Sequence, residues 1–238
     1  MRHVPFVLSA LALSACGFSA NAQQGAGPRT AQTFDVGDFR AISAAGAHDV
    51  IVTTGGAPSV RAEGPQKGIE RLDIRVEDGT LKIGTRKNAT GSWSGNGGKI
   101  VVYVTAPRVE AAALAGSGDL SIDRAESDSF KASLAGSGDL KIAALRAGDA
   151  DFSLAGSGDM EVAGGVGSAK MSLAGSGGMK LGSLQARQAK MSIAGSGGIR
   201  ANVTEAADVS VAGSGSVKLT GGARCAISKR GSGSVNCS

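Results

Sequence analysis

Aromatic side chains are scarce in this chain of 238 residues, which contains six Phe, one Tyr and one Trp. Proteins that bind single-stranded nucleic acid stack bases on aromatic rings along a basic stripe. Here Lys and Arg are interspersed with Asp and Glu along the sequence, and the net charge is only +5. We therefore expect no nucleic-acid partner. A mild attraction to anionic surface polymers or lipid is compatible with this balance.

Histidine and cysteine are almost as rare, with two His and three Cys. His3 precedes the folded part, and His48 is predicted to be a surface or edge residue of a strand rather than a ligand. No Cys/His spacing typical of a zinc site is present. Serine is abundant, but a serine nucleophile needs a positioned base. The sequence therefore predicts no catalytic residues, no cofactor and no Cys/His metal site.

Apolar runs are short, and the longest, Val4–Ala15, is too short to span a bilayer. It follows Arg2 and precedes Ala20-Asn21-Ala22, a small-x-small site, which predicts a signal peptide over residues 1–22 cleaved after Ala22. A second interpretation competes with the first. Leu13–Cys16 resembles a bacterial lipobox, which predicts lipidation at Cys16. Both predict export to the periplasm, outer membrane or cell surface, with membrane contact only through the lipid anchor.

Cys225 and Cys237 then remain as an even pair in an oxidising compartment. A disulfide needs Cα atoms about 5.5 Å apart. The chain between them must therefore reverse near Gly231. We predict this bond, and two unpaired thiols are the alternative.

Glycine, in contrast, is plentiful, and it recurs inside one repeated sequence motif, here called the phrase. Its first full copy is Leu114-Ala-Gly-Ser-Gly-Asp-Leu120. The central glycines are spaced 20, 20, 19, 20, 18 and 18 residues apart, at Gly116, Gly136, Gly156, Gly175, Gly195, Gly213 and Gly231. A fixed period of this size is typical of a stacked array. These glycines are predicted to form the corners, where positive φ or close backbone approach is needed.

Apolar residues within each repeat share one parity, as in Leu134, Leu140 and Ile142. Side chains alternate along an extended chain, so these three face one core. A helix needs apolar residues three and four apart. The sequence therefore predicts an all-β, single-domain, parallel β-helix (β-solenoid) with about 20 residues per rung.

Residues 23–32 are small and polar and are predicted to be a flexible linker, so the domain spans 33–238. Residues 33–110 are predicted to form degenerate rungs or a cap, and the Gly-Ser-Gly repeats occupy 111–238. Residues 45–50 read as an eroded copy of the phrase, and Asp78-Gly79 predicts a hairpin. A loop is expected over 88–98, which contains Trp93. Strands are predicted over 47–53, 59–62, 72–76, 80–85 and 99–105.

Asp119, Asp139 and Asp159 end three consecutive phrases and should form a ladder on the outer face. Neighbouring carboxylates would repel by about 1 kcal/mol per pair. We expect solvent and nearby cations to relieve this repulsion, and bound Ca²⁺ is the alternative. A polysaccharide-cleaving site is disfavoured because same-side carboxylates do not oppose one another across a cleft. Ser117 and its six counterparts are expected to hydrogen-bond corner amides.

The order of these features resembles the head GIN domain family of exported bacterial proteins labelled auto-transporter adhesins. The resemblance spans about Phe34 to Val217 and rests on the Gly-Ser-Gly-Asp phrases and on Phe39–Ile42, Asp49–Val52, Asp78–Ile83 and Ile100–Pro107. It implies a right-handed β-helix, an exported location and no known catalysis.

The function favoured by the sequence is a non-enzymatic adhesin or binding module of the cell envelope that presents its solenoid faces to a surface glycan or an envelope protein. A structural role in envelope maintenance is the alternative. A polysaccharide-active enzyme is a remote one.

Overall fold

The computed structural model describes residues 28–86 and 98–238. The predicted signal peptide 1–22, with its alternative processing sites at Ala22 and Cys16, lies outside the described residues. So do Trp93 and most of the loop expected around it. Nowhere in the described ranges is a helix long and apolar enough to cross a bilayer.

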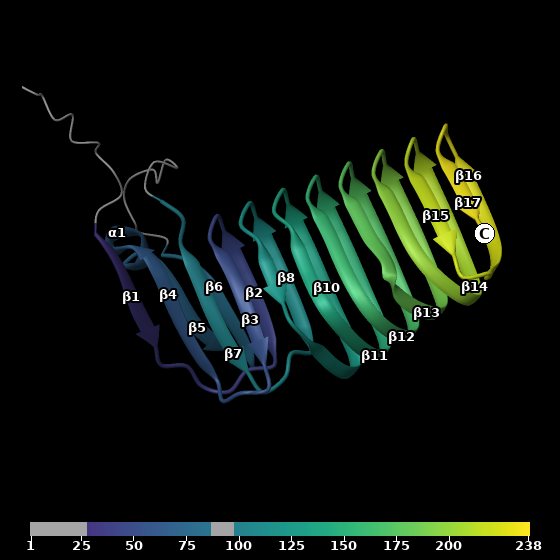
Figure 1. Ribbon diagram of the computed structural model, residues 1–238. Coiled ribbons are helices and arrows are strands. Elements are labelled where there is room, and N and C mark those ends of the chain that lie inside the picture. Colours follow the sequence, from purple (N-terminus) through teal and green to yellow (C-terminus); the bar gives the residue numbers. More distant parts are fainter. Residues whose placement is uncertain (1–27, 87–97) are drawn as a thin grey trace, which may run out of the picture.

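The described fold is built from strands with one short helix (Figure 1). The N-terminal part contains β1 (Arg29–Phe34), β2 (Ala41–Gly46), β3 (Asp49–Thr54), β4 (Ser59–Pro65), α1 (Gln66–Ile69), β5 (Leu72–Glu77), β6 (Thr80–Thr85) and β7 (Val101–Ala106). The repeats form β8 (Ala111–Gly116), β9 (Leu120–Ile122), β10 (Ala125–Gly136), β11 (Leu140–Gly156), β12 (Asp159–Gly175), β13 (Gly178–Gly195), β14 (Gly198–Gly213), β15 (Ser216–Thr220), β16 (Arg224–Arg230) and β17 (Ser234–Cys237).

Successive repeats stack in parallel and in register, which confirms the β-solenoid. Leu134 pairs with Leu114 on one side and with Leu154 on the other, and the column continues through Leu173, Ile193 and Val211. The residues predicted to face the core do so, since Leu134, Leu140 and Ile142 are at most 2% exposed. Burying a side chain of this size stabilises the fold by about 1.5–3 kcal/mol. Repetition therefore makes one continuous apolar core.

The Gly-Ser-Gly turns lie along one edge of the stack, the upper edge in Figure 1. The carbonyl oxygen of Gly116 accepts hydrogen bonds from the amides of Ser137 (2.9 Å) and Gly138 (3.2 Å) in the next rung. These bonds leave no room for a side chain. A Cβ on Gly136, where φ is +137°, would lie 2.1 Å from that carbonyl oxygen, and one on Gly138 would lie 1.9 Å from the carbonyl oxygen of Gly118. The predicted role of the glycines as corners is therefore correct.

Corner amides bond to backbone carbonyls and not to serine hydroxyls, so the role expected of Ser117 and its counterparts is wrong. The amides of Ser137 and Ser157 donate to the glycine carbonyls of the preceding rung, each at 2.9 Å. The hydroxyls are left on the outside of the turn because the side chain between two inward glycines must point away from the core.

The opposite edge absorbs all variation in repeat length. Between β11 and β12 the register shifts after Ile142, which produces the 19-residue step. Gly164, with φ +129°, takes up the shortened corner, and a Cβ there would lie 2.0 Å from the carbonyl oxygen of Leu145. Two further shifts between β13 and β14 produce an 18-residue step. The turn edge is thus constant and the opposite edge is adjustable.

The N-terminal strands do not stack in chain order. The rung of β2 and β3 lies between that of β6 and β7 on one side and that of β8 and β9 on the other. Gly46 pairs with Gly116, so the eroded copy of the phrase is a true rung. Residues 59–77 are not rungs as expected, because β4 and β5 run antiparallel to β7 and β6. These antiparallel strands cap the solenoid.

The predicted linker is also partly wrong, because residues 29–32 belong to β1. This strand pairs antiparallel with β4, and five of its six side chains are exposed. A strand held at a sheet edge by backbone hydrogen bonds alone needs no alternating apolar pattern, so the sequence carried no signal for it. The single turn of α1 was likewise missed.

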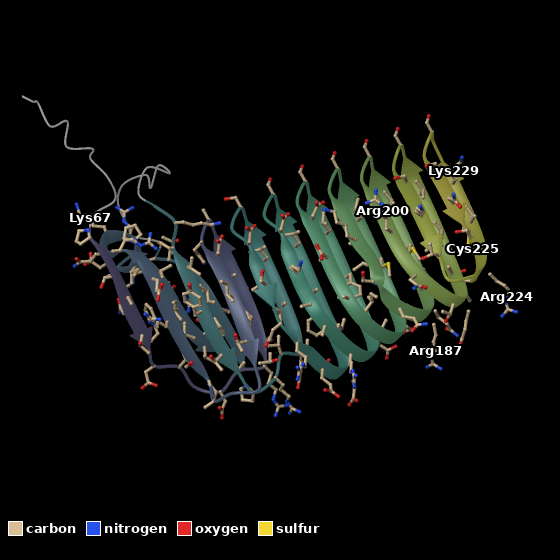
Figure 2. All side chains as sticks on the ribbon, viewed as in Figure 1. Lys67, Arg187, Arg200, Arg224, Cys225 and Lys229 are labelled. Atoms are coloured by element: carbon tan, nitrogen blue, oxygen red, sulfur yellow. A yellow bond between two sulfur atoms is a disulfide. The ribbon has the colours of Figure 1, made fainter. Side chains whose placement is uncertain are left out.

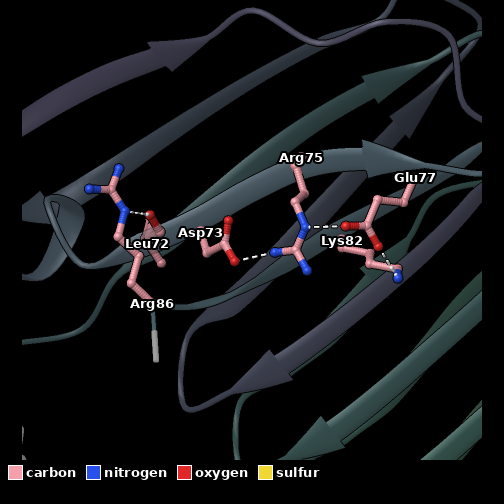
Figure 3. A network of polar contacts seen from close by, with 6 residues as sticks. All are labelled: Leu72, Asp73, Arg75, Glu77, Lys82 and Arg86. Carbon is pink, nitrogen blue, oxygen red and sulfur yellow. Dashed lines mark hydrogen bonds and ion pairs between the residues drawn. The ribbon is translucent and has the colours of Figure 1, made fainter. Parts of the chain in front are cut away.

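The predicted hairpin joins β5 and β6 through Asp78 (φ 50°) and Gly79 (φ 69°). Its outer face carries an ion-pair chain (Figure 3) in which Arg75 contacts Asp73 and Glu77, and Glu77 also contacts Lys82. Lys82 and Arg75 lower the pKa of Glu77 to about 2. All four groups are solvent-exposed, so the chain orders the surface of the cap more than it stabilises the fold.

The chain reverses at the last Gly-Ser-Gly, and Cys225 and Cys237 are joined with Cα atoms 6.7 Å apart. Each cysteine lies in an inward column, Cys225 beside Ala207 and Cys237 beside Leu219. The bridge therefore spans the interior of the terminal rung and links β16 to β17.

We predict that Gly138→Ala lowers the free energy of unfolding by about 1–3 kcal/mol, because the new methyl group would overlap a backbone carbonyl that cannot move away. Gly182→Ala is the matched control, since Gly182 is exposed in β13 and has nothing within 4 Å of its added Cβ. Urea unfolding of both variants measures the difference. Equal stability would contradict the close approach of the turns.

Candidate functional site

The aspartates that end the phrases form the predicted ladder, and Asp49 from the eroded copy extends it. The carboxylates of Asp49, Asp119 and Asp139 each accept a hydrogen bond from the backbone amide of the next aspartate. These bonds measure 3.3 Å from the amide of Asp119 to Asp49, 3.0 Å from that of Asp139 to Asp119, and 2.9 Å from that of Asp159 to Asp139. The ladder is therefore tied to the backbone of the solenoid.

Lysines neutralise both ends of this ladder. Lys99 Nζ lies 2.6 Å from Asp49 Oδ2, and Lys180 Nζ lies 2.8 Å from Asp159 Oδ2. Hydrogen bonds to these carboxylates raise the pKa of both lysines, and the charges of the inner aspartates add to the effect. Two cations and three backbone amides thus relieve the repulsion between like charges.

The calcium hypothesis gains no support from this geometry. Within residues 28–86 and 98–238, no three His, Cys, Asp or Glu side chains converge on a point that could hold a metal ion. The Asp column also ends after Asp159, where Gly178 and Gly198 and then serines follow in register. Calcium binding by Asp119, Asp139 and Asp159 stays a prediction.

A second regular surface lies on the outer side of the sheet that runs into the turns. We call it the serine face. One of its columns is almost all serine, namely Ser43, Ala113, Ser133, Ser153, Ser172, Ser192, Ser210 and Ser228. A neighbouring column carries charge, namely Lys131, Asp151, Lys170, Lys190 and Asp208. Hydroxyls thus repeat at about 4.8 Å along the solenoid.

Two shallow troughs adjoin one another on the serine face. One, of about 440 Å³, extends from Ser129 towards Asp208, and the other, of about 510 Å³, extends from Ser172 back to Ala41. Both are lined by Lys131, Asp151 and Lys170, so they form one continuous depression. Lys170 Nζ lies 3.6 Å from Asp151 Oδ2. The depression offers hydroxyls and charges of both signs but no aromatic ring among its described lining residues.

His48 is buried and not at the surface, contrary to expectation, with 5% of its area exposed. It occupies the column of the second turn glycines, since a Cβ on Gly118 would lie 2.0 Å from the His48 carbonyl oxygen. Its imidazole donates a hydrogen bond to the backbone of Ile83 in β6. Its Nε2 atom has no hydrogen-bond partner among the described residues. Because the ring is buried, it does not lie on the exposed serine face.

Lys99 and Lys180 are the site residues that the sequence did not single out. Lys180 could have been found from the sequence. It lies two residues after Gly178, which replaces aspartate where the Asp column ends. Lys99 gave no such signal, because it meets Asp49 only through the pairing of β7 with β3.

The part of the chain that contains the eroded first copy, the capping hairpin and most of the glycine turns matches a known family. Residues 38–223 match the family described as "Putative auto-transporter adhesin, head GIN domain". The chain belongs to this family. The comparison with curated protein sequences gave no match.

Solved structures of similar shape carry related descriptions. A putative adhesin from Bacteroides fragilis superposes with a TM-score of 0.80 at 23% identity, over 89% of this chain and 97% of its own. A putative lipid binding protein from Parabacteroides distasonis superposes with a TM-score of 0.70 at 26% identity, over 90% of this chain and 98% of its own. A putative adhesin from Parabacteroides merdae superposes with a TM-score of 0.68 at 16% identity, over 90% of this chain and 98% of its own. The GIN-domain solenoid is thus shared by sequences that have diverged widely.

We predict that Asp139→Asn leaves stability unchanged or slightly raised, because the amide oxygen still accepts the bond from Asp159 and one negative charge is removed from the ladder. Asp139→Ala should cost up to about 1 kcal/mol for the lost acceptor. Thermal melts with added Ca²⁺ and with chelator should coincide for the unsubstituted protein. A calcium-dependent rise in Tm that disappears in the Asn variant would restore the metal hypothesis.

We also predict a loss of stability in mild acid that depends on His48. Burial lowers the pKa of His48 below its usual 6.5, and the bond to Ile83 and the charge of Asp49 offset part of this. Between the folded and unfolded pKa values the unfolded chain binds more protons, so stability falls as the pH decreases below 6.5. Each unit of depression is equivalent to about 1.4 kcal/mol.

Urea unfolding at pH 7 and pH 5 measures this effect, and His48→Gln is the control because a neutral amide does not titrate. The difference between the two pH values should shrink in that variant. An identical difference in both proteins would show that His48 is not the titrating group.

Proposed function

We propose that this chain is an exported, non-enzymatic binding module of the cell envelope whose serine face holds an acidic surface glycan. The observation that carries the proposal is the continuous depression over the serine face, which is lined by hydroxyls and by Lys131, Asp151 and Lys170. The adhesin description of the family agrees with such a role.

The depression is suited to an extended polymer because its groups repeat with the rungs. Serine hydroxyls donate to and accept from sugar hydroxyls. Lys131 has no carboxylate partner among the described residues, so its ammonium group is available to an acidic sugar. Charge and hydrogen bonding replace the aromatic stacking on which neutral sugar clefts depend, and this favours an acidic glycan over a neutral one.

Binding is favoured over catalysis by the orientation of the acidic groups. The carboxylates of Asp49, Asp119, Asp139 and Asp159 lie on one side of the stack, and three of them accept backbone hydrogen bonds while the fourth, Asp159, pairs with Lys180. Hydrolysis of a glycosidic bond needs two carboxyl groups on opposite sides of the scissile bond.

A glycan array tests the proposal with two matched double variants. Asp151→Ala with Lys170→Ala removes an ion pair from the serine face, whereas Lys141→Ala with Glu161→Ala removes an ion pair, 3.0 Å long, between neighbouring rungs elsewhere on the solenoid. Both changes leave the net charge unaltered and remove exposed pairs worth at most about 1 kcal/mol.

We expect binding to glycans that contain acidic sugars, weakened about tenfold or more in the serine-face variant and retained in the control. Equal loss in both variants, or no binding to any glycan by the unsubstituted protein, would refute the serine face as the site. Mass spectrometry of the N-terminus of protein purified from its own cells tests export. We expect a start at Gln23 or at a lipidated Cys16, and an unprocessed Met1 would contradict export.

A further inference from the structure

Charge is divided unequally along the solenoid, although it looks interspersed in the sequence. Residues 23–179 contain 16 Lys and Arg against 18 Asp and Glu, a net charge of −2. Residues 180–238 contain 8 Lys and Arg against 2 Asp and Glu, a net charge of +6. From β8 onward each rung stacks on the one before it, so position in the sequence becomes position along the axis, and the C-terminal end is strongly basic.

The cations surround this end. Arg200 and Lys218 are neighbours in one outward column, in register with Lys180. Figure 2 shows Arg187 and Arg224 at the opposite edge from the glycine turns, while Lys229 lies towards the turns. Arg230 continues the outer side of the serine-face sheet beside Ala212. We call the group Arg187, Arg200, Lys218, Arg224, Lys229 and Arg230 the basic end.

None of these six cations has a carboxylate partner among the described residues, whereas Lys180, next in the column, is paired with Asp159. The Asp column ends at Asp159 in β12, and Gly178, Gly198 and Ser216 take its place. The same outward surface thus changes from carboxylates in β12 to the unpaired Arg200 in β14, two rungs further along. The positive charge at the basic end is therefore available to an external anion.

The last rung also carries an exposed apolar side chain. Ile227 lies in register with the buried Val209, yet it is 51% exposed because, among the described strands, β16 pairs only with β14. Lys229 occupies the column of the buried Val211. The tip thus combines an apolar side chain with cations, as surfaces that bind anionic membranes do.

Protection of an open sheet edge explains only part of this pattern. Lysine on an edge strand discourages end-to-end pairing of solenoids, and this accounts for Lys229 and Arg230 in β16. It does not account for Arg187 in β13 or Arg200 in β14, because both strands are already paired on both sides.

We propose that the basic end docks end-on against an anionic lipid bilayer. Cations that surround a rod on several sides match a plane perpendicular to the rod, whereas a linear polyanion would need them along a single face. Ile227 at the tip would enter the interface. The proposal goes beyond glycan binding, and this orientation would leave the serine face upright and accessible.

Vesicle co-sedimentation of the full chain tests this proposal, with phosphatidylcholine vesicles compared with vesicles containing 30% phosphatidylglycerol. The predicted leader is the same in every variant, so the difference between variants is the measurement. The basic-end variant replaces Arg187, Arg200, Lys218 and Arg224 with Gln. The matched control replaces the exposed Arg29, Lys67, Arg124 and Arg146 with Gln, which removes the same charge elsewhere.

We expect the unsubstituted protein and the control to bind anionic vesicles in preference to neutral ones, with affinity that falls as salt is raised. Each cation near an anionic surface contributes about fivefold in affinity, so the removal of four should weaken binding by up to about 600-fold in the basic-end variant. Ile227→Ser should weaken binding without changing the melting temperature, because the side chain is half exposed.

Three outcomes would overturn the proposal. One is equal binding to neutral and anionic vesicles. Another is equal loss in the basic-end and control variants, which would reduce the effect to net charge. The third is binding to a soluble polyanion such as polygalacturonate, lost in the basic-end variant, with no binding to anionic vesicles, which would assign the basic end to a polymer. Glycan-array results for the serine face are independent of all three.

Discussion

A glycine carbonyl oxygen that accepts hydrogen bonds from two amides of the next turn sets the geometry of the repeats. The Gly116 carbonyl accepts from Ser137 and Gly138, and the same arrangement is repeated at Gly136 with Ser157 and Gly158. These contacts bring backbone against backbone so closely that neither turn glycine can carry a Cβ. The turn therefore fixes the phase of the repeats, and the columns that flank it keep one register while the opposite edge shifts.

Like residues stack because the register is fixed, and this creates both favourable and unfavourable ladders. Leucine on leucine fills most of a narrow core, which also holds the buried rings of Phe130 and Phe152. Aspartate on aspartate would be repulsive, yet each inner carboxylate accepts a backbone amide, and Lys99 and Lys180 neutralise the two ends. A repeated sequence can thus carry a column of like charge, provided that both ends are paired.

Much of this architecture could be predicted, because period and parity follow directly from backbone geometry. The inward column of Leu134, the glycine corners, the hairpin at Asp78 and the pairing of Cys225 with Cys237 all depend on spacing within the chain. Features that depend on spatial order could not be predicted. The rung of β2 and β3 is flanked by strands that come later in the sequence, and the contact between Lys99 and Asp49 is a consequence of that insertion.

His48 shows why a prediction made from the local sequence fails at the boundary of a repeat. Its place in the rung is that of a glycine, and in any inner rung the neighbouring carbonyl would exclude an imidazole. In the rung of β2 and β3 the ring instead contacts the backbone of Ile83 in β6. The candidate binding groups follow the same logic, because the serine face depends on uniform stacking whereas the basic end depends on where stacking stops. The ends of a solenoid are therefore chemically distinct from its faces, and a protein built from one phrase can offer two different surfaces to two different partners.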